Sequence, residues 1–228
     1  MFLNREDAGR QLATELLRFK NERPCVLALP RGGVPVAFEV AKALNAPLDL
    51  VIVRKIGAPN QPELAIGAVV DGQNPELVVN QRIVDILDVS AEYLQEERAR
   101  QIREIERRRQ VYLGDRPRVD VAGHTALIID DGIATGATIR AALRATRRAR
   151  PKRLILAVPV APSDTVSELR DEADEVICLE THDAFGAISL YYEDFAQVSD
   201  DEVRDLLGRA AQISPAPSIG QKAEPGRS

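Results

Sequence analysis

The sequence has few of the residues that build disulfide-bonded or metal-bound scaffolds. It contains only two cysteines, Cys25 and Cys178, and no tryptophan in 228 residues. Each cysteine lies in an apolar run, and the residues near it do not have the spacing of a metal site. We therefore expect two buried free thiols. The chain is long enough to bury a sizeable hydrophobic core without such supports.

Long apolar runs are also missing. The longest, residues 48–53 and 125–129, fall far short of the roughly 20 residues that cross a bilayer. The first seven residues are partly acidic and lack the basic and apolar regions of a secretory signal. We therefore expect a cytoplasmic protein with no membrane partner.

Neither sign of charge dominates the chain as a whole. The 30 basic and 35 acidic residues give a net charge of -5, which disfavours a nucleic-acid coat protein, and we expect no nucleic-acid partner. Locally, residues 140–153 hold seven Lys or Arg and no acid, whereas residues 163–205 hold 14 acids. The basic cluster could raise the local potential for a phosphorylated ligand, pair with the acidic region of the same or another subunit, or bind RNA.

Short apolar runs alternate with amphipathic stretches along most of the chain. Strands are predicted at residues 25–29, 48–53, 125–130, 154–158 and 176–179, and helices at 4–19, 34–44, 90–113, 138–149 and 163–171. Residues 64–70 and 76–79 predict two antiparallel strands around a turn at 71–75. The alternation predicts an α/β fold with a mostly parallel twisted sheet flanked by helices. We expect one domain over residues 1–213 and a disordered tail at 214–228.

The stretch from Leu127 to Ile139 carries the clearest chemical signal. A buried strand ends at Asp130 and Asp131, and a glycine-bearing turn with Thr135 and Thr138 then opens a helix. Backbone N–H groups of such a turn can hold an anion, and the hydroxyls add donors. The paired carboxylates would repel a phosphate but can accept hydrogen bonds from vicinal hydroxyls or hold a divalent cation. The implied ligand is a phosphorylated sugar.

Two other phosphate-binding motifs are excluded by spacing. A Walker A loop needs four residues between its glycines and a lysine after the second, whereas Gly132 and Gly136 are separated by three residues and Ala137 follows. The G-x-G-x-x-G pattern of dinucleotide-binding proteins is absent at this strand end.

The turn resembles the loop that binds phosphoribosyl pyrophosphate (PRPP) in type I phosphoribosyltransferases. The segment Pro30-Arg31-Gly32-Gly33 is similar to the pyrophosphate loop of that family, and Arg54-Lys55 with the following turn-rich loop is similar to its catalytic lid. All three occur in the family's chain order. The flanks, which include Asn4-Arg5-Glu6-Asp7-Ala8-Gly9 and Tyr191-Tyr192-Glu193-Asp194-Phe195, resemble a poorly characterised bacterial branch of predicted phosphoribosyltransferases.

The resemblance implies a role for each matching residue. Asp130 and Asp131 would bind the ribose hydroxyls and hold Mg²⁺, directly or through those hydroxyls and water. Arg54 and Lys55 would act as catalytic cations that neutralise the leaving group, and closure of residues 56–63 would exclude water. The 5-phosphate would be bound by Gly132, Ile133, Ala134, Thr135, Gly136, Ala137 and Thr138, and the pyrophosphate by Arg31, Gly32 and Gly33.

The resemblance also implies a fold and an activity. The type I fold would carry a small hood, built from residues 1–20 and 181–202, and a helical insertion at 90–113. The activity would be Mg²⁺-dependent transfer of the 5-phosphoribosyl group of PRPP to a nucleobase-like acceptor, with release of pyrophosphate, in a homodimer. Ala134 stands where the 6-oxopurine members have an aspartate proposed as a proton acceptor. A methyl group cannot take a proton, which disfavours hypoxanthine and guanine, and Glu63 is an alternative acid or base.

Other interpretations stay open at this stage. The same fold could serve a regulatory protein that senses PRPP or nucleotides and acts through RNA or a protein partner, or an enzyme that hydrolyses PRPP. Residues 181–195 contain nearly all the late aromatic side chains, which could stack on a base or simply pack together, and His182 lies among them. The Arg-rich helix at 90–113 is expected to be mostly solvated and could contribute to a dimer contact.

Overall fold

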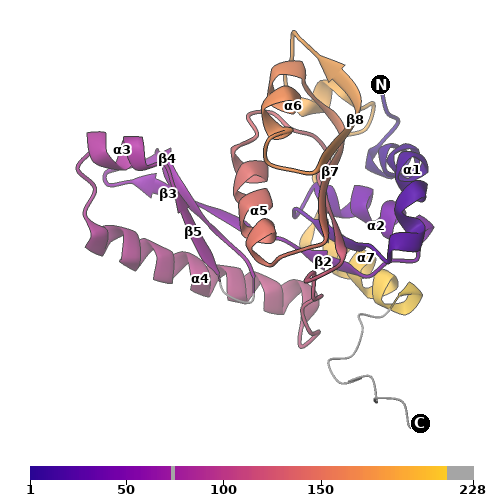
Figure 1. Ribbon diagram of the computed structural model, residues 1–228, viewed down its shortest axis with the longest axis horizontal. Coiled ribbons are helices and arrows are strands. Elements are labelled where there is room, and N and C mark those ends of the chain that lie inside the picture. Colours follow the sequence, from indigo (N-terminus) through magenta and orange to yellow (C-terminus); the bar gives the residue numbers. More distant parts are fainter. Residues whose placement is uncertain (73–74, 215–228) are drawn as a thin grey trace, which may run out of the picture.

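The centre of the molecule is a sheet of five parallel strands. The computed structural model describes residues 1–72 and 75–214 (Figure 1). The strand order is β2-β1-β6-β7-β8, where the strands are β1 (Cys25–Ala28), β2 (Leu48–Leu50), β6 (Thr125–Ile129), β7 (Arg153–Pro162) and β8 (Glu175–His182). This sheet confirms the predicted α/β fold. Residues 73–74 of the predicted turn and 215–228 of the predicted tail lie outside the described residues.

Helices cover both faces of this sheet. On one face lie α1 (Arg5–Leu16), α2 (Gly33–Leu44) and α7 (Asp200–Ile213), and on the other α5 (Ala137–Arg148) and α6 (Ser163–Leu169) (Figure 1). Val26 and Ala28 of β1 join the first hydrophobic cluster, whereas Cys25 and Leu27 join the second. Successive side chains of a strand point to opposite faces, so a strand covered on both sides is apolar throughout. None of the helices in the described ranges is both long and apolar enough to cross a membrane.

An arm extends away from the main sheet (Figure 1). It consists of an antiparallel sheet of β3 (Val53–Ala58), β4 (Gln61–Val70) and β5 (Glu76–Val79), together with α3 (Gln81–Ile86) and α4 (Ala91–Leu113). The two antiparallel strands predicted at residues 64–70 and 76–79 are confirmed. The strand predicted at 48–53 is divided, because β2 ends at Leu50 and β3 begins at Val53.

The turn-rich loop predicted after Lys55 is instead a β-hairpin, so that prediction was wrong. Residues of β3 pair with β4 from Val53↔Val70 to Ala58↔Gln61, with register shifts around Gly57. Asn60 takes a left-handed conformation, with φ of 62°, and closes the turn. The turn formers in this segment therefore mark a bulge and a tight turn rather than an unpaired loop.

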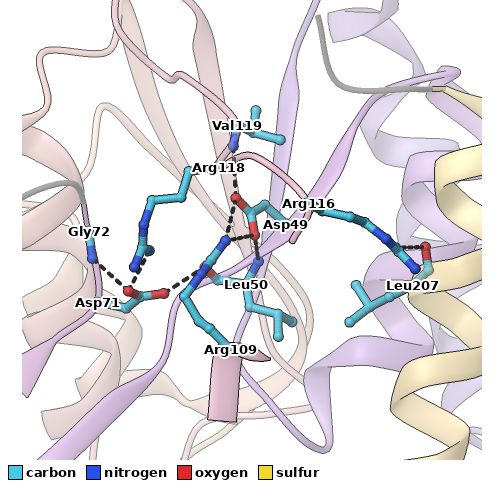
Figure 2. Close-up of polar contacts among 9 residues, drawn as sticks. All are labelled: Asp49, Leu50, Asp71, Gly72, Arg109, Arg116, Arg118, Val119 and Leu207. Carbon is cyan, nitrogen blue, oxygen red and sulfur yellow. Dashed lines mark hydrogen bonds and ion pairs between the residues drawn. The ribbon is translucent and has the colours of Figure 1, made fainter. Parts of the chain in front are cut away.

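The helix α4 is fixed to the main sheet by a buried ion network (Figure 2). The Ser90 side chain caps the helix by accepting a hydrogen bond from the Tyr93 amide. One face of α4 is buried at roughly every fourth residue, and the other face is solvated as predicted. On the buried face, Arg109 donates to Asp49 at 3.0 Å and to Asp71 at 2.8 Å. Figure 2 shows that Arg109 lies between these two carboxylates, which come from β2 and from the residue after β4.

Candidate functional site

Two loops meet where the strand order of the sheet reverses. From β1 the chain passes to β2 on one side, and from β6 it passes to β7 and β8 on the other, so the boundary lies between β1 and β6. Open α/β sheets bind ligands beyond the carboxyl ends of the strands at such a boundary. The Leu29 amide donates to the Ile129 carbonyl at 3.0 Å, which brings the two following loops together.

Glycines in the first loop allow it to lie against the acidic pair. A Cβ atom on Gly32 would lie 2.1 Å from Asp131 Oδ2, and one on Gly33 would lie 2.9 Å from the Asp130 Cα. Because the Gly33 contact is with backbone, a side chain there could not be accommodated by a rotamer change. The structure therefore brings Gly32 and Gly33 together with Asp130 and Asp131, as the sequence motifs suggested.

The two aspartates have different surroundings. Asp131 is buried, whereas Asp130 is partly buried and accepts a hydrogen bond from the Asp131 amide through Oδ1. Burial, and after it the neighbouring Asp131 carboxylate, raise the pKa of Asp130 well above its usual range. Neither Asp130 Oδ2 nor Asp131 Oδ1 accepts a hydrogen bond from a protein donor in the described part of the chain. Each carboxylate therefore keeps one oxygen for a ligand.

Arg5 is a member of the site that sequence reasoning missed. Its Nε donates to Asp131 Oδ2 at 2.7 Å, and its Nη1 donates to the Ala196 carbonyl at 2.7 Å. The guanidinium lies over the Phe195 ring, 3.7 Å from the centroid. The only local signal is Asn4, whose side chain caps α1 by accepting from the Asp7 amide and so makes Arg5 the first residue of the helix. Nothing in the local sequence linked Arg5 to a carboxylate 126 positions away.

The late aromatic side chains pack around the acidic pair. The Tyr192 hydroxyl donates to the Asp131 carbonyl, and its ring packs against Phe2 and Phe195 at centroid distances of 5.4 and 5.0 Å. Phe2 and Tyr192 also form a backbone bridge between the N-terminal segment and the segment before α7. His182 and Phe185 stack on Tyr191 instead, with centroids 4.5 and 4.9 Å away. The expected hood segments, residues 1–20 and 181–202, therefore meet beside Asp131.

The second loop leaves unpaired amides at the start of α5. Gly136 has φ of 71° and precedes the helix, and Ile133 is anchored by its amide to the Val160 carbonyl. Between them, the amides of Ala134, Thr135 and Gly136 donate to no acceptor in the described part of the chain. Ala134, Thr135 and Ala137 are exposed. Unpaired amides at a helix N-terminus are suited to bind an anion.

The predicted cations lie farther from the acidic pair. The Arg31 guanidinium is directed to Asp200 of α7, at 3.5 Å. Arg54 donates to Gln101 of α4 at 3.1 Å, and Lys55 is exposed. Partial burial, and after it the nearby Arg108 guanidinium, lower the pKa of Arg54. The structure thus places Arg54 against α4 and does not bring Arg54 or Lys55 into contact with Asp130 and Asp131.

Comparison with known proteins identifies the family. Residues 2–196 match the model of the phosphoribosyl transferase domain. The chain belongs to the phosphoribosyltransferase family. Two proteins of Mycobacterium tuberculosis, from strains CDC 1551 / Oshkosh and ATCC 25618 / H37Rv and each named "Putative phosphoribosyl transferase", are 44% identical over 226 residues. These residues cover 99% of this chain and 51% of each relative, so the chain spans about half the length of these curated relatives.

A solved structure is also similar over most of this phosphoribosyltransferase. The crystal structure of TT1426 from Thermus thermophilus is 42% identical, with a TM-score of 0.78 over 91% of this chain and 97% of that chain. The membership of the phosphoribosyltransferase family that the loop motifs indicated is thereby confirmed.

Five of the seven basic residues at 140–153 form ion pairs with acidic residues of the same chain. Of the three explanations offered for residues 140–153, intramolecular pairing is what the structure shows. The pairs are Arg140 with Glu168, Arg144 with Glu172, Arg147 with Asp174, Arg148 with Glu76, and Arg153 with both Glu22 and Glu175. Hydrogen bonds from Arg144 and Arg147 lower the pKa values of Glu172 and Asp174 respectively. The cluster therefore presents much less free positive charge than its sequence suggested.

The acidic pair fits one mode of Mg²⁺ binding. Within residues 1–72 and 75–214, no group of three or more His, Cys, Asp or Glu side chains is placed to hold a metal ion. Mg²⁺ commonly binds through one or two carboxylates and completes its shell with substrate oxygens and water. The free oxygens of Asp130 and Asp131 fit that shared mode.

Proposed function

We propose that this protein transfers the 5-phosphoribosyl group of PRPP to a nitrogenous base and releases pyrophosphate. The observation that carries the proposal is the pairing of two features at the β1/β6 boundary. Unpaired amides of residues 134–136 at the start of α5 suit the 5-phosphate, and two free carboxylate oxygens beside them suit the ribose hydroxyls. A phosphorylated pentose presents both groups at once.

In the proposed reaction the bond between C1 of the ribose and the pyrophosphate oxygen breaks, and a base nitrogen forms the new bond to C1. The loop of residues 132–138 holds the 5-phosphate, and Asp130 and Asp131 orient the ring through its hydroxyls. Gly32 and Gly33 allow their loop to lie against Asp131 and Asp130, where its backbone would meet the pyrophosphate. Bound Mg²⁺ would offset the charge that develops on the leaving group. Glu63 is the candidate acceptor for the proton that the base loses.

Arg5 and Tyr192 position Asp131 in this scheme. Arg5 holds one carboxylate oxygen, and the Tyr192 hydroxyl holds the backbone carbonyl of the same residue. The carboxylate is therefore fixed from the hood before a ligand binds, which reduces the ordering cost of binding. Ala134 is exposed beside the amides and offers no proton acceptor, so we expect adenine or orotate rather than hypoxanthine or guanine as the acceptor.

Calorimetric titration of PRPP, with and without Mg²⁺, tests the proposal. The five bases adenine, orotate, uracil, guanine and hypoxanthine are then added in turn, and released pyrophosphate is measured. Mg²⁺-dependent binding followed by pyrophosphate release with one base is the expected result. Binding without release would favour the PRPP-sensing alternative, and release of free ribose 5-phosphate would indicate hydrolysis. Absence of PRPP binding would overturn the proposal. The homodimer and the cytoplasmic location remain predictions.

The binding of PRPP with Mg²⁺ is expected to strengthen as the pH rises. The pKa of Asp130 is raised, so its carboxyl stays protonated to a higher pH than the usual value of about 3.9. Below the raised pKa the neutral carboxyl cannot bind a cation, and above it the carboxylate can. The measurement is PRPP affinity across the acidic to neutral range. Asp130→Asn serves as the control, because its profile retains only the titration of PRPP itself. An identical profile in both proteins would exclude Asp130 as the titrating group.

A further inference from the structure

A small polar cavity lies between the pyrophosphate loop, α4 and the first turn of α7. Its volume is about 200 Å³. It is lined by Arg31 of the loop, by Arg107, Arg108, Val111 and Tyr112 of α4, and by Asp200 of α7. Three of these six side chains are arginines, which come from two segments far apart in the sequence.

The arginines of this cavity have N–H donors that are not used in hydrogen bonds to the described residues. Glu104 accepts from Nε and Nη2 of Arg107 and from Nε of Arg108. In the described part of the chain, Nη1 of Arg107 and both Nη atoms of Arg108 have no hydrogen-bond acceptor. Arg31 has one ion pair, at 3.5 Å to Asp200, and no hydrogen bond to the described residues. Guanidinium groups with free, forked donors are suited to bind phosphate oxygens.

Positive charge is concentrated along this side of α4. Three guanidinium groups and one carboxylate, that of Asp200, line the cavity, and Glu104, which is not among the lining residues, pairs with Arg107 and Arg108. Asp200 also accepts the Tyr112 hydroxyl at 2.7 Å. This positive charge also acts on Arg54. Burial is the largest cause of the lowered pKa of Arg54, and the nearby Arg108 guanidinium is the next largest. Like charges held close together favour the binding of a multiply charged anion.

We propose that Arg31, Arg107 and Arg108 form an oxyanion site that binds pyrophosphate, so that the helical insertion supplies cations for the leaving group. The proposal rests on the proposed function for its natural ligand, the pyrophosphate released at the neighbouring glycines. Arg31 links the two places, because it directly precedes Gly32, which lies against Asp131. Free phosphate has the same chemistry with fewer oxygens and charges, and it should bind the same residues more weakly.

Calorimetric titration of pyrophosphate, and separately of phosphate, into the full chain tests this site with matched variants. Arg108→Gln removes a cavity charge, and Arg103→Gln removes an exposed charge from the same helix. Asp200→Asn removes the carboxylate that faces the cavity, and Asp201→Asn removes its exposed neighbour in the same turn. Thermal unfolding and circular dichroism show that each variant is folded.

The two test variants, Arg108→Gln and Asp200→Asn, should shift the affinity for pyrophosphate in opposite directions. Arg108→Gln is expected to weaken pyrophosphate binding about tenfold or more, because a charge-assisted hydrogen bond is lost, whereas Arg103→Gln should change it less than about twofold. Asp200→Asn is expected to tighten binding severalfold, and Asp201→Asn should leave it nearly unchanged. Arg108→Lys should restore part of the affinity. Equal effects of Arg108→Gln and Arg103→Gln, or no effect of either, would overturn the site.

Failure of this site and failure of the proposed function give different results. If PRPP does not bind but pyrophosphate binding depends on Arg108, the proposed function fails and the oxyanion site stands. If PRPP binds and reacts while Arg108→Gln and Arg103→Gln bind pyrophosphate equally, the site fails and the function stands. The Asp131→Asn variant tests the PRPP site separately from the arginine site. It should weaken PRPP binding but keep the affinity for pyrophosphate within about twofold of that of the unmodified protein.

Discussion

Replacing Arg109 with methionine is expected to lower the free energy of unfolding by about 3–5 kcal/mol. The Arg109 side chain is 9% exposed, and those of Asp49 and Asp71 are 6% and 1% exposed. Burial already raises the pKa of Asp71, although Arg109 and Arg118 act in the opposite direction. Removal of Arg109 would leave two buried carboxylates with fewer donors (Figure 2). Urea unfolding measured by circular dichroism gives the change, since the chain has no tryptophan for fluorescence.

The matched control for this variant is Arg103→Met, at an exposed position of the same helix. It should change the free energy of unfolding by less than about 0.5 kcal/mol. A loss below about 1 kcal/mol for Arg109→Met would show that the remaining donors compensate. Those donors are Arg118 and the Gly72 amide for Asp71, and the Val119 and Leu50 amides for Asp49. In that case the network would not be what fixes the arm to the main sheet.

Replacing Asp131 with asparagine is expected to weaken PRPP binding by about 10- to 100-fold. A hydrogen bond to a charged group contributes about 1.5–3 kcal/mol, and each 1.4 kcal/mol corresponds to a tenfold change in affinity. The variant keeps the shape of the side chain but loses the charge that pairs with Arg5 and that would bind the ribose hydroxyls. Calorimetric titration of PRPP in the presence of Mg²⁺ measures the loss.

Asp183→Asn is the control for the Asp131 variant, because it removes an exposed carboxylate near the end of β8. PRPP affinity should stay within about twofold of the unmodified protein. Unchanged affinity in Asp131→Asn as well would remove this carboxylate from the proposed site. The Arg5→Gln variant separates the two roles of Asp131, because it breaks the ion pair and leaves the carboxylate charged. It should weaken PRPP binding less than Asp131→Asn does, since the ligand can still reach both oxygens.

Local patterns predicted the elements that lie close to the candidate site. The strand before Asp130, the glycine turn after it and the helix that follows were all predicted at nearly their observed positions. They were predictable because apolar runs, glycines and caps act within a few residues. The segment after Lys55 was predicted wrongly for the same kind of reason. Pro59 and Asn60 signal a turn, but whether the flanking residues pair depends on the partner strand, and a bulge at Gly57 hides the alternation.

The sequence showed where charged residues are concentrated, but it did not show which of them form ion pairs. The uneven distribution of basic and acidic residues was evident in the sequence, and three explanations for it were equally compatible with that sequence. The structure chose among them because α5 and the segment 168–174 lie side by side, so that Arg140, Arg144 and Arg147 face acids 27 or 28 positions away. Such pairs form only where separate elements pack against each other, and a short stretch of sequence does not show that packing.

By itself the sequence determined the fold class, the family and the two loops that meet at the carboxyl ends of β1 and β6. These follow from short motifs whose conformations are restricted by glycine, by helix capping and by strand periodicity. Tertiary structure alone decided that Arg5 holds Asp131, that Arg109 joins the arm to the main sheet, and that Arg31 shares a cavity with Arg107 and Arg108. The two ion pairs among these contacts, Arg5–Asp131 and Arg109–Asp49, join residues 126 and 60 positions apart. Long side chains on separate elements meet only after the hydrophobic layers have packed. The residues next to such a side chain in the sequence therefore do not indicate which residue it contacts.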